Sequence, residues 1–197
     1  MRSSSDLEAA LVPVVDVLEG LGVTYRIGGS VASATLGVPR STLDVDLVCN
    51  LGSAQVRAFV AALEDAYYVE AAAVRAAIGR GGSFNLIHLG TMMKVDVFLV
   101  RDGEFDRVSF ERHVERALSD EPGARSFSFR SPEDVVLRKL EWYRAGGEVS
   151  ERQWADTIGV LNVQGDALDY AYLQRWAERL GVADLLNRAS TEAASDD

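Results

Sequence analysis

The sequence predicts an α/β (α+β) protein in two parts, a small mixed sheet flanked by helices and a C-terminal helical bundle. Strand and helix patterns alternate over roughly the first 130 residues, and only helical patterns follow. A chain of 197 residues is long enough for one domain with a helical appendage. We therefore expect a core at 1–125, a helical region at 126–189 and a disordered acidic tail at 190–197.

In the first part, glycine and polar turns separate short elements. Helices are expected at 6–21, 30–36, 53–66, 71–78 and 105–118. Strands are expected at 23–27, 43–48, 67–69, 84–89, 94–100 and 126–129. The strands at 84–89 and 94–100 flank a Gly-Thr turn, and this pattern indicates a hairpin.

The second part begins with a clear helix start, Ser131-Pro132-Glu133-Asp134. Serine caps the helix, proline suits its first turn and the acids favour its N-terminus. We expect this helix to end before Gly146-Gly147, with two further helices at 150–161 and 167–186.

The composition and net charge of the chain argue against extended DNA binding and against insertion into a membrane. The net charge of −10 repels a long polyanion, so extended binding to duplex DNA is not expected. No apolar run approaches the ~20 residues of a membrane span, and the N-terminus lacks a signal-like apolar stretch. A single cysteine, Cys49, lies in an apolar strand and cannot form an internal disulfide. We expect a cytoplasmic protein without membrane contact.

Three aspartates interrupt otherwise apolar strands. Asp44 and Asp46 are two residues apart, so in a strand both side chains project from the same face. Neighbouring carboxylates disfavour each other's ionisation, and a divalent cation between them removes that penalty. Asp96 in "KVDVFLV" is a third such charge. If its strand lies beside the first one, three carboxylates converge and can hold a pair of metal ions acting on a phosphoryl group.

The glycine turn upstream of the aspartates suits a phosphate. Gly28-Gly29 allows a ligand to approach the backbone closely, and Ser30 opens a short helix whose free N–H groups favour an anion. An Asp-X-Asp pair alone is more often a solvated edge of a sheet. The glycines and the carboxylates together favour a nucleotide site.

These motifs resemble a known family. "GGSVASATLGVPRSTLDVDLV" followed by "KVDVFLV" looks like the nucleotidyltransferase core of the DNA polymerase β-like superfamily. The resemblance implies a nucleotidyltransferase sheet in which Gly28, Gly29 and Ser30 hold NTP phosphates. It further implies that Asp44 and Asp46 bind two Mg²⁺ ions, and that Asp96 assists the second metal and activates the attacking hydroxyl.

The helical part resembles a narrower group, the nucleotidyltransferase-like toxins of type IV toxin–antitoxin and abortive-infection systems. The resemblance, in "SPEDVVLRKLEWYRAGGEVSERQWADTIGVL", assigns nucleotide-phosphate binding to Lys139 and support of the active site to Asp156. Both residues could equally be charges at the edge of a helix core. Arg40 could contact the triphosphate or be an ordinary solvated loop residue.

The leading hypothesis is a Mg²⁺-dependent nucleotidyltransferase that moves NMP from an NTP, ATP among them, to a hydroxyl. The acceptor implied by the toxin-like group is a tRNA 3′ end, with an antitoxin protein as possible partner. The alternative is a small-molecule adenylyltransferase acting on an antibiotic, and a third hypothesis is a catalytically idle nucleotide-binding module. The choice of NTP, the acceptor, the antitoxin and the oligomeric state stay open.

Overall fold

The computed structural model describes residues 4–42, 44–119 and 121–195. The chain folds into two compact units. The first contains residues 1–31 and 41–129, and the second contains residues 32–40 and 130–197. The sequence pattern alone suggests a boundary near residue 125 and keeps residues 32–40 in the first part.

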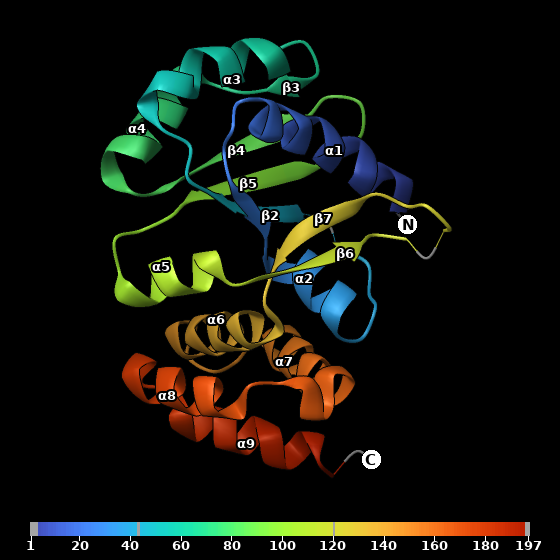
Figure 1. The fold of residues 1–197 in the computed structure, drawn as a ribbon, viewed down its shortest axis with the longest axis vertical. Coiled ribbons are helices and arrows are strands. Elements are labelled where there is room, and N and C mark those ends of the chain that lie inside the picture. Colours follow the sequence, from blue (N-terminus) through green and yellow to red (C-terminus); the bar gives the residue numbers. More distant parts are fainter. Residues whose placement is uncertain (1–3, 43, 120, 196–197) are drawn as a thin grey trace. The chain divides into compact units, whose positions relative to one another are not determined.

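The first unit is built on a seven-stranded sheet in the order β3-β4-β5-β2-β1-β7-β6 (Figure 1). β1 is antiparallel to β2 and parallel to β7, and β5 is parallel to β2 and antiparallel to β4. The sheet is therefore mixed, as predicted, and the β4–β5 hairpin is confirmed. The strands are β1 (Tyr25–Ile27), β2 (Asp44–Cys49), β3 (Tyr67–Tyr68), β4 (Ser83–His88), β5 (Lys94–Leu99), β6 (His113–Ala117) and β7 (Ser126–Arg130).

Helices pack on this sheet through apolar side chains. α1 contacts β5 and α3, and α4 contacts α3 and β4. Val15 of α1, Phe59 of α3 and Val95 of β5 are fully buried, and together such residues form the core of the unit. The helices that begin in this unit are α1 (Ser4–Gly20), α2 (Gly29–Leu36), the 3₁₀ turn η1 (Ser53–Gln55), α3 (Val56–Leu63), α4 (Ala71–Arg80) and α5 (Glu104–Glu111).

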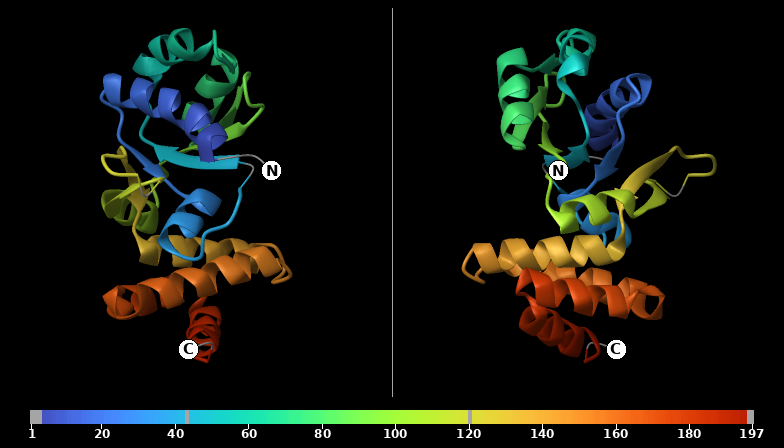
Figure 2. Two further views of the ribbon diagram at one scale, coloured as in Figure 1. Left: turned by 90° about the vertical axis from the view of Figure 1, so that its right-hand side faces the viewer. Right: turned by 60° about the vertical axis from the view of Figure 1, so that its left-hand side comes forward.

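The second unit is helical. α6 packs against α7, α8 and α9, and α7 packs against α9; Figure 2 shows α6 and α7 side by side. Ser131 caps α6 as predicted, because its Oγ accepts a hydrogen bond from the Asp134 N–H. The elements are α6 (Pro132–Ala145), α7 (Glu151–Gln164), η2 (Gly165–Ala167), α8 (Tyr170–Leu180) and α9 (Ala183–Ala193).

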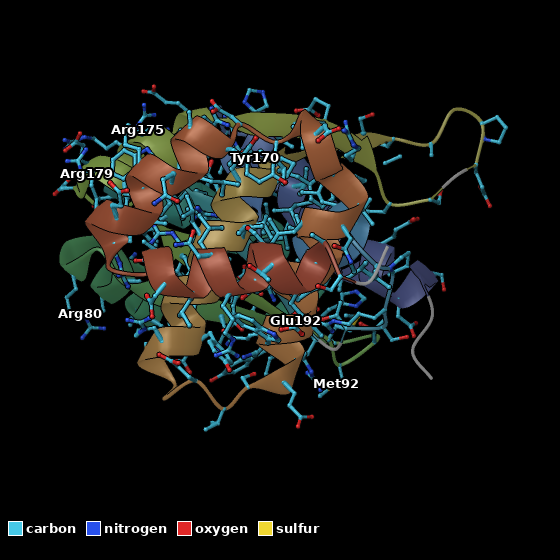
Figure 3. The ribbon with its side chains drawn as sticks, turned by 90° about the horizontal axis from the view of Figure 1, so that it is seen from below. Arg80, Met92, Tyr170, Arg175, Arg179 and Glu192 are labelled. Atoms are coloured by element: carbon cyan, nitrogen blue, oxygen red, sulfur yellow. The ribbon has the colours of Figure 1, made fainter. Side chains whose placement is uncertain are left out.

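On α8, two exposed arginines cover aromatic rings. The guanidinium of Arg175 lies 5.5 Å from the ring centre of Tyr172, and that of Arg179 lies 4.5 Å from the ring centre of Trp176. Figure 3 shows these arginines close together on the helix. Both rings are buried, so the arginines shield the apolar face of α8 while their charges stay in water.

Three predicted elements are wrong. The helix expected at 105–118 ends at Glu111, and His113–Ala117 forms the edge strand β6 instead. The helix expected at 167–186 is interrupted at Gly181, where a left-handed backbone (φ 71°) separates α8 from α9. α9 continues to Ala193, so the first four residues of the expected disordered tail are helical. Leu43, predicted to begin the second strand, lies outside the described residues.

Candidate active site

The register of β2 and β5 brings the three aspartates to one face of the sheet. Asp46 lies directly opposite Asp96, and Asp44 lies directly opposite Lys94. Between them, Val45, Leu47 and their partners on β5 point to the other face and are fully buried. The prediction that the Asp96 strand lies beside the Asp44 strand is confirmed.

The Gly28-Gly29 turn packs closely against β2, the strand that contains Asp46. The Gly28 N–H donates a 2.8 Å hydrogen bond to the Asp46 carbonyl oxygen. Gly29 has φ 54°, and a Cβ atom added there would collide with the Asp46 carboxylate. Only glycine meets both conditions, and α2 begins at this residue with Ser30 in its first turn. The turn and the carboxylate are thus parts of one local structure.

Asp96 is bound to a cation from its own strand. The Nζ of Lys94 lies 2.6 Å from Oδ2 of Asp96, with 45% of the lysine side chain exposed. The hydrogen bond to Asp96 raises the pKa of the Lys94 ammonium, and the charges of Asp44 and Asp46 raise it further. Lys94 is therefore within electrostatic reach of all three carboxylates.

The donor chemistry of this face fits magnesium, which prefers carboxylate oxygens. In the described part of the chain, however, no three His, Cys, Asp or Glu side chains are grouped to hold a metal ion. The backbone register is as predicted, but the side chains of Asp44, Asp46 and Asp96 are not grouped as a metal site. Asp96 is paired with Lys94, and Asp46 lies against Gly29.

Two further residues belong to this face and were not identified from the sequence. The Thr42 hydroxyl lies 3.1 Å from Oδ1 of Asp44 and donates a hydrogen bond to it. Asn85 on β4 lies opposite Asp96, on the side away from Asp46, and is exposed. Residues directly opposite on neighbouring strands project from the same face, so Asp46, Asp96 and Asn85 form a row across three strands. Lys94 was not identified from the sequence either, although strand alternation within "KVD" would have placed it on the face of Asp96.

The second unit contains the other predicted site residues, Arg40, Lys139 and Asp156. The carboxylate of Asp156 is 5% exposed and accepts hydrogen bonds from Arg40 Nε at 2.6 Å, Arg40 Nη2 at 2.7 Å and Lys139 Nζ at 2.6 Å. Burial alone would raise the pKa of Asp156, but these two cations lower it below its ordinary value. Arg40 is thus not a simple solvated loop residue.

Two glycines allow Arg40 to reach Asp156. A Cβ atom at Gly37 would lie 2.8 Å from the Gly159 carbonyl carbon, and one at Gly159 would lie 3.2 Å from Val38. The loop after α2 therefore lies directly on α7. The amide of Gln164 adds a 2.6 Å hydrogen bond to the Leu36 carbonyl oxygen.

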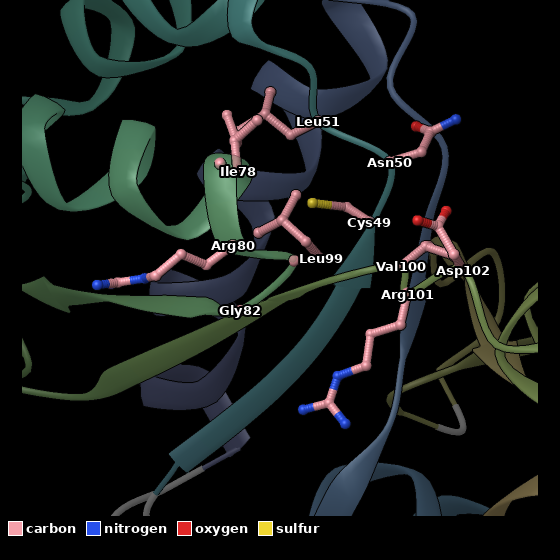
Figure 4. A pocket seen from close by; sticks show the side chains of 12 residues that line it. Cys49, Asn50, Leu51, Ile78, Arg80, Gly82, Leu99, Val100, Arg101 and Asp102 are labelled. Atoms are coloured by element: carbon pink, nitrogen blue, oxygen red, sulfur yellow. The ribbon is translucent and has the colours of Figure 1, made fainter.

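The first unit also has an open hollow of about 890 Å³, lined by Cys49, Leu99, Arg101 and the end of α4 (Figure 4). It lies at the carboxyl ends of β2 and β5, whereas the aspartates lie at the amino ends. Cys49 comes three residues after Asp46, which places it about 10 Å further along the strand. The hollow is therefore not the carboxylate site. None of the helices within the described ranges is long and apolar enough to cross a membrane.

Comparison with known proteins identifies the fold. No protein-family model matches the sequence, and neither does any curated protein. Among solved structures, the antibiotic-resistance factor ANT(2'')-Ia is similar with a TM-score of 0.57 and 13% identity, over 92% of this chain and 97% of that one. ANT(2'')-Ia in complex with adenylyl-2''-tobramycin gives 0.55 and 15%, over 93% and 98%. An antigenic nucleotidyltransferase-like protein from Paracoccidioides brasiliensis gives 0.51 and 17%, over 89% and 91%. The chain has the fold of the nucleotidyltransferases.

Proposed function

We propose that this protein is a Mg²⁺-dependent nucleotidyltransferase that transfers NMP from an NTP to a hydroxyl group. The observation that carries the proposal is the register of Asp46 opposite Asp96, with the Gly28-Gly29 turn packed against Asp46. The nucleotidyltransferase fold of the solved relatives supports it.

In this proposal each residue of the sheet face has one task. Asp44 and Asp46 would hold two metal ions, with Asp96 assisting the second, and the bound metals would supply positive charge against the triphosphate. Gly28, Gly29 and Ser30 receive the phosphates at the start of α2. Asp96 accepts the proton of the acceptor hydroxyl, whose oxygen bonds to the α-phosphorus while the bond to the leaving pyrophosphate breaks.

Arg40, Lys139 and Asp156 are proposed to serve the nucleotide from the second unit. Lys139 supplies charge for the phosphates, and Asp156 fixes both cations through the hydrogen bonds described above. Because Asp156 is buried and doubly paired, we propose a positioning role for it rather than contact with substrate.

The acceptor is proposed to be a small cationic molecule. ANT(2'')-Ia is an antibiotic-resistance factor that was solved with adenylyl-2''-tobramycin, and this supports a small-molecule acceptor. The net charge of −10 favours a cation over an RNA end. The second candidate, a tRNA 3′ end with an antitoxin protein as regulator, follows from the toxin-like resemblance of the helical part.

The test incubates the purified protein with each α-³²P-labelled NTP and Mg²⁺, with either an aminoglycoside panel or total tRNA. We expect label on one class of acceptor, and its loss in Asp44→Asn and Asp46→Asn. The matched control is Asp102→Asn, an exposed carboxylate at the opposite end of the strands. Equal labelling by the wild type and Asp46→Asn would exclude the catalytic assignment.

A further inference from the structure

Lys94 shares one face of the sheet with the proposed metal ligands and is a direct neighbour of two of them. It is the first residue of β5, lies opposite Asp44 and shares a face with Asp96 two residues later. Three carboxylates and one ammonium therefore occupy four neighbouring positions on the two strands. On this face the lysine supplies the charge that a bound cation would supply.

The choice of residue is unusual for this chain. The sequence has 20 Lys and Arg residues, and only Lys94 and Lys139 are lysine. Lysine carries a compact point charge on a flexible stem, whereas arginine carries a wide planar fork. A compact, flexible ammonium can neutralise a small carboxylate site and then move away from it.

We propose that Lys94 is a built-in counter-cation that holds the carboxylate face together without metal and competes with Mg²⁺ for it. The inference rests on the proposed metal site. Directly opposed like charges on neighbouring strands destabilise a sheet, and the Lys94–Asp96 ion pair offsets this repulsion. Metal binding requires Asp96 to exchange Lys94 for the metal, so Lys94 sets the metal concentration at which the site fills.

The proposal predicts opposite effects of one substitution on stability and on metal affinity. Lys94→Met keeps most of the length of the side chain and removes its charge. Without metal, it lowers the melting temperature by about 2–4 °C, because three carboxylates lose their counter-charge. It tightens Mn²⁺ and Mg²⁺ binding about tenfold, because no ammonium has to be displaced. The metal therefore raises the melting temperature of Lys94→Met more than that of the wild type.

Two variants separate this effect from general changes in charge. Lys94→Arg retains a cation on the face, so its metal affinity stays below that of Lys94→Met. Arg101→Met removes one exposed positive charge just after the opposite end of β5 and leaves metal affinity unchanged. If Lys94→Met and Arg101→Met bind metal equally well, the effect is one of net charge and the proposal is wrong.

Chemical modification gives a readout that does not depend on activity. An amine-reactive reagent followed by mass spectrometry distinguishes the only two lysines of the chain. Added Mg²⁺ is expected to increase modification of Lys94, since release from Asp96 exposes its amine, and to leave the buried Lys139 unchanged.

Titration of the full chain with metal, followed by calorimetry, distinguishes failure of the Lys94 proposal from failure of the proposed metal site. Metal binding with equal affinity in the wild type and Lys94→Met overturns the role of Lys94 and leaves the metal site intact. No metal binding in either protein overturns the metal site, and the counter-cation role with it. Tighter binding in Lys94→Met, lost again when Asp46→Asn is added, supports both.

Discussion

The Cα of Gly29 lies so close to the Asp46 carboxylate that no side chain fits between them. The same glycine has a positive φ, which L residues rarely adopt. Space and backbone conformation therefore both require glycine at the start of α2.

Gly29→Ala is expected to destabilise the protein by about 1–3 kcal/mol, since the added methyl group displaces Asp46 and strains the turn. Urea unfolding measures this change, and the transfer assay should show a loss of at least about tenfold in rate. Gly79→Ala is the control, because Gly79 lies inside α4 with open space around it. A Gly29→Ala protein as stable and active as Gly79→Ala would contradict the described packing.

The Asp156 ion pairs lead to a prediction about acid stability. The pKa of Asp156 is lowered from its ordinary value of 3.8, so its ionised form stabilises the folded state. This contribution is fully present above the ordinary value and is lost as pH falls through the lowered pKa. In Asp156→Asn, Arg40 and Lys139 lose their partner, at a cost of about 3–5 kcal/mol.

Unfolding of wild type and Asp156→Asn between pH 2 and 7 checks this prediction. The difference in free energy of unfolding should be constant above about pH 5 and shrink as the pH falls below 3.8. A difference that stays the same across the whole range would show that the charge of Asp156 does not stabilise the fold.

The single cysteine provides a probe of the first unit. Cys49 is fully buried at the end of β2, and burial raises the pKa of its thiol to about 11. The thiolate is the reactive form, so a disulfide reagent at pH 8 should modify the native protein at least about a hundredfold more slowly than the urea-unfolded chain. Comparable rates would mean that β2 opens readily in the native state.

Gly181 is expected to be necessary for the break between α8 and α9. It has φ 71°, and its N–H donates to the Glu178 carbonyl while the next N–H donates to Ala177. Gly181→Ala should cost about 1 kcal/mol, measured by urea unfolding, because a side chain disfavours this backbone conformation. Gly20→Ala, at the end of α1 with open space around it, should change stability far less.

The carboxylate face could be predicted because the signals for it lie within short stretches of the sequence. Strand alternation placed Asp44 and Asp46 together, and charges within apolar runs marked them and Asp96. The same alternation would also have placed Lys94 on this face, but Lys94 was missed because a lysine at the start of a strand is ordinarily a solvated charge. Its partnership with Asp96 depends on side-chain geometry that spacing does not give. The contacts of Thr42 and Asn85 were missed for the same reason.

The errors in the fold have a different cause. β6 is polar and alternates only weakly, and its strand conformation comes from its place beside β7 at the sheet edge. Such pairing is a tertiary interaction that local pattern cannot reveal. Gly181, by contrast, was visible in the sequence as a helix-ending residue, yet the apolar periodicity on both sides of it favoured one continuous helix.

Residues 32–40 belong to the compact unit that also contains residues 130–197, although they lie far earlier in the sequence than the other helices of that unit. A fragment ending at Phe129 would carry this loop without α7, the helix on which Gly37 and Arg40 rest. The helices of the second unit therefore cannot be exchanged without changes in this loop. In evolution or in protein engineering, a new set of C-terminal helices would have to be acquired together with matching changes in this early loop.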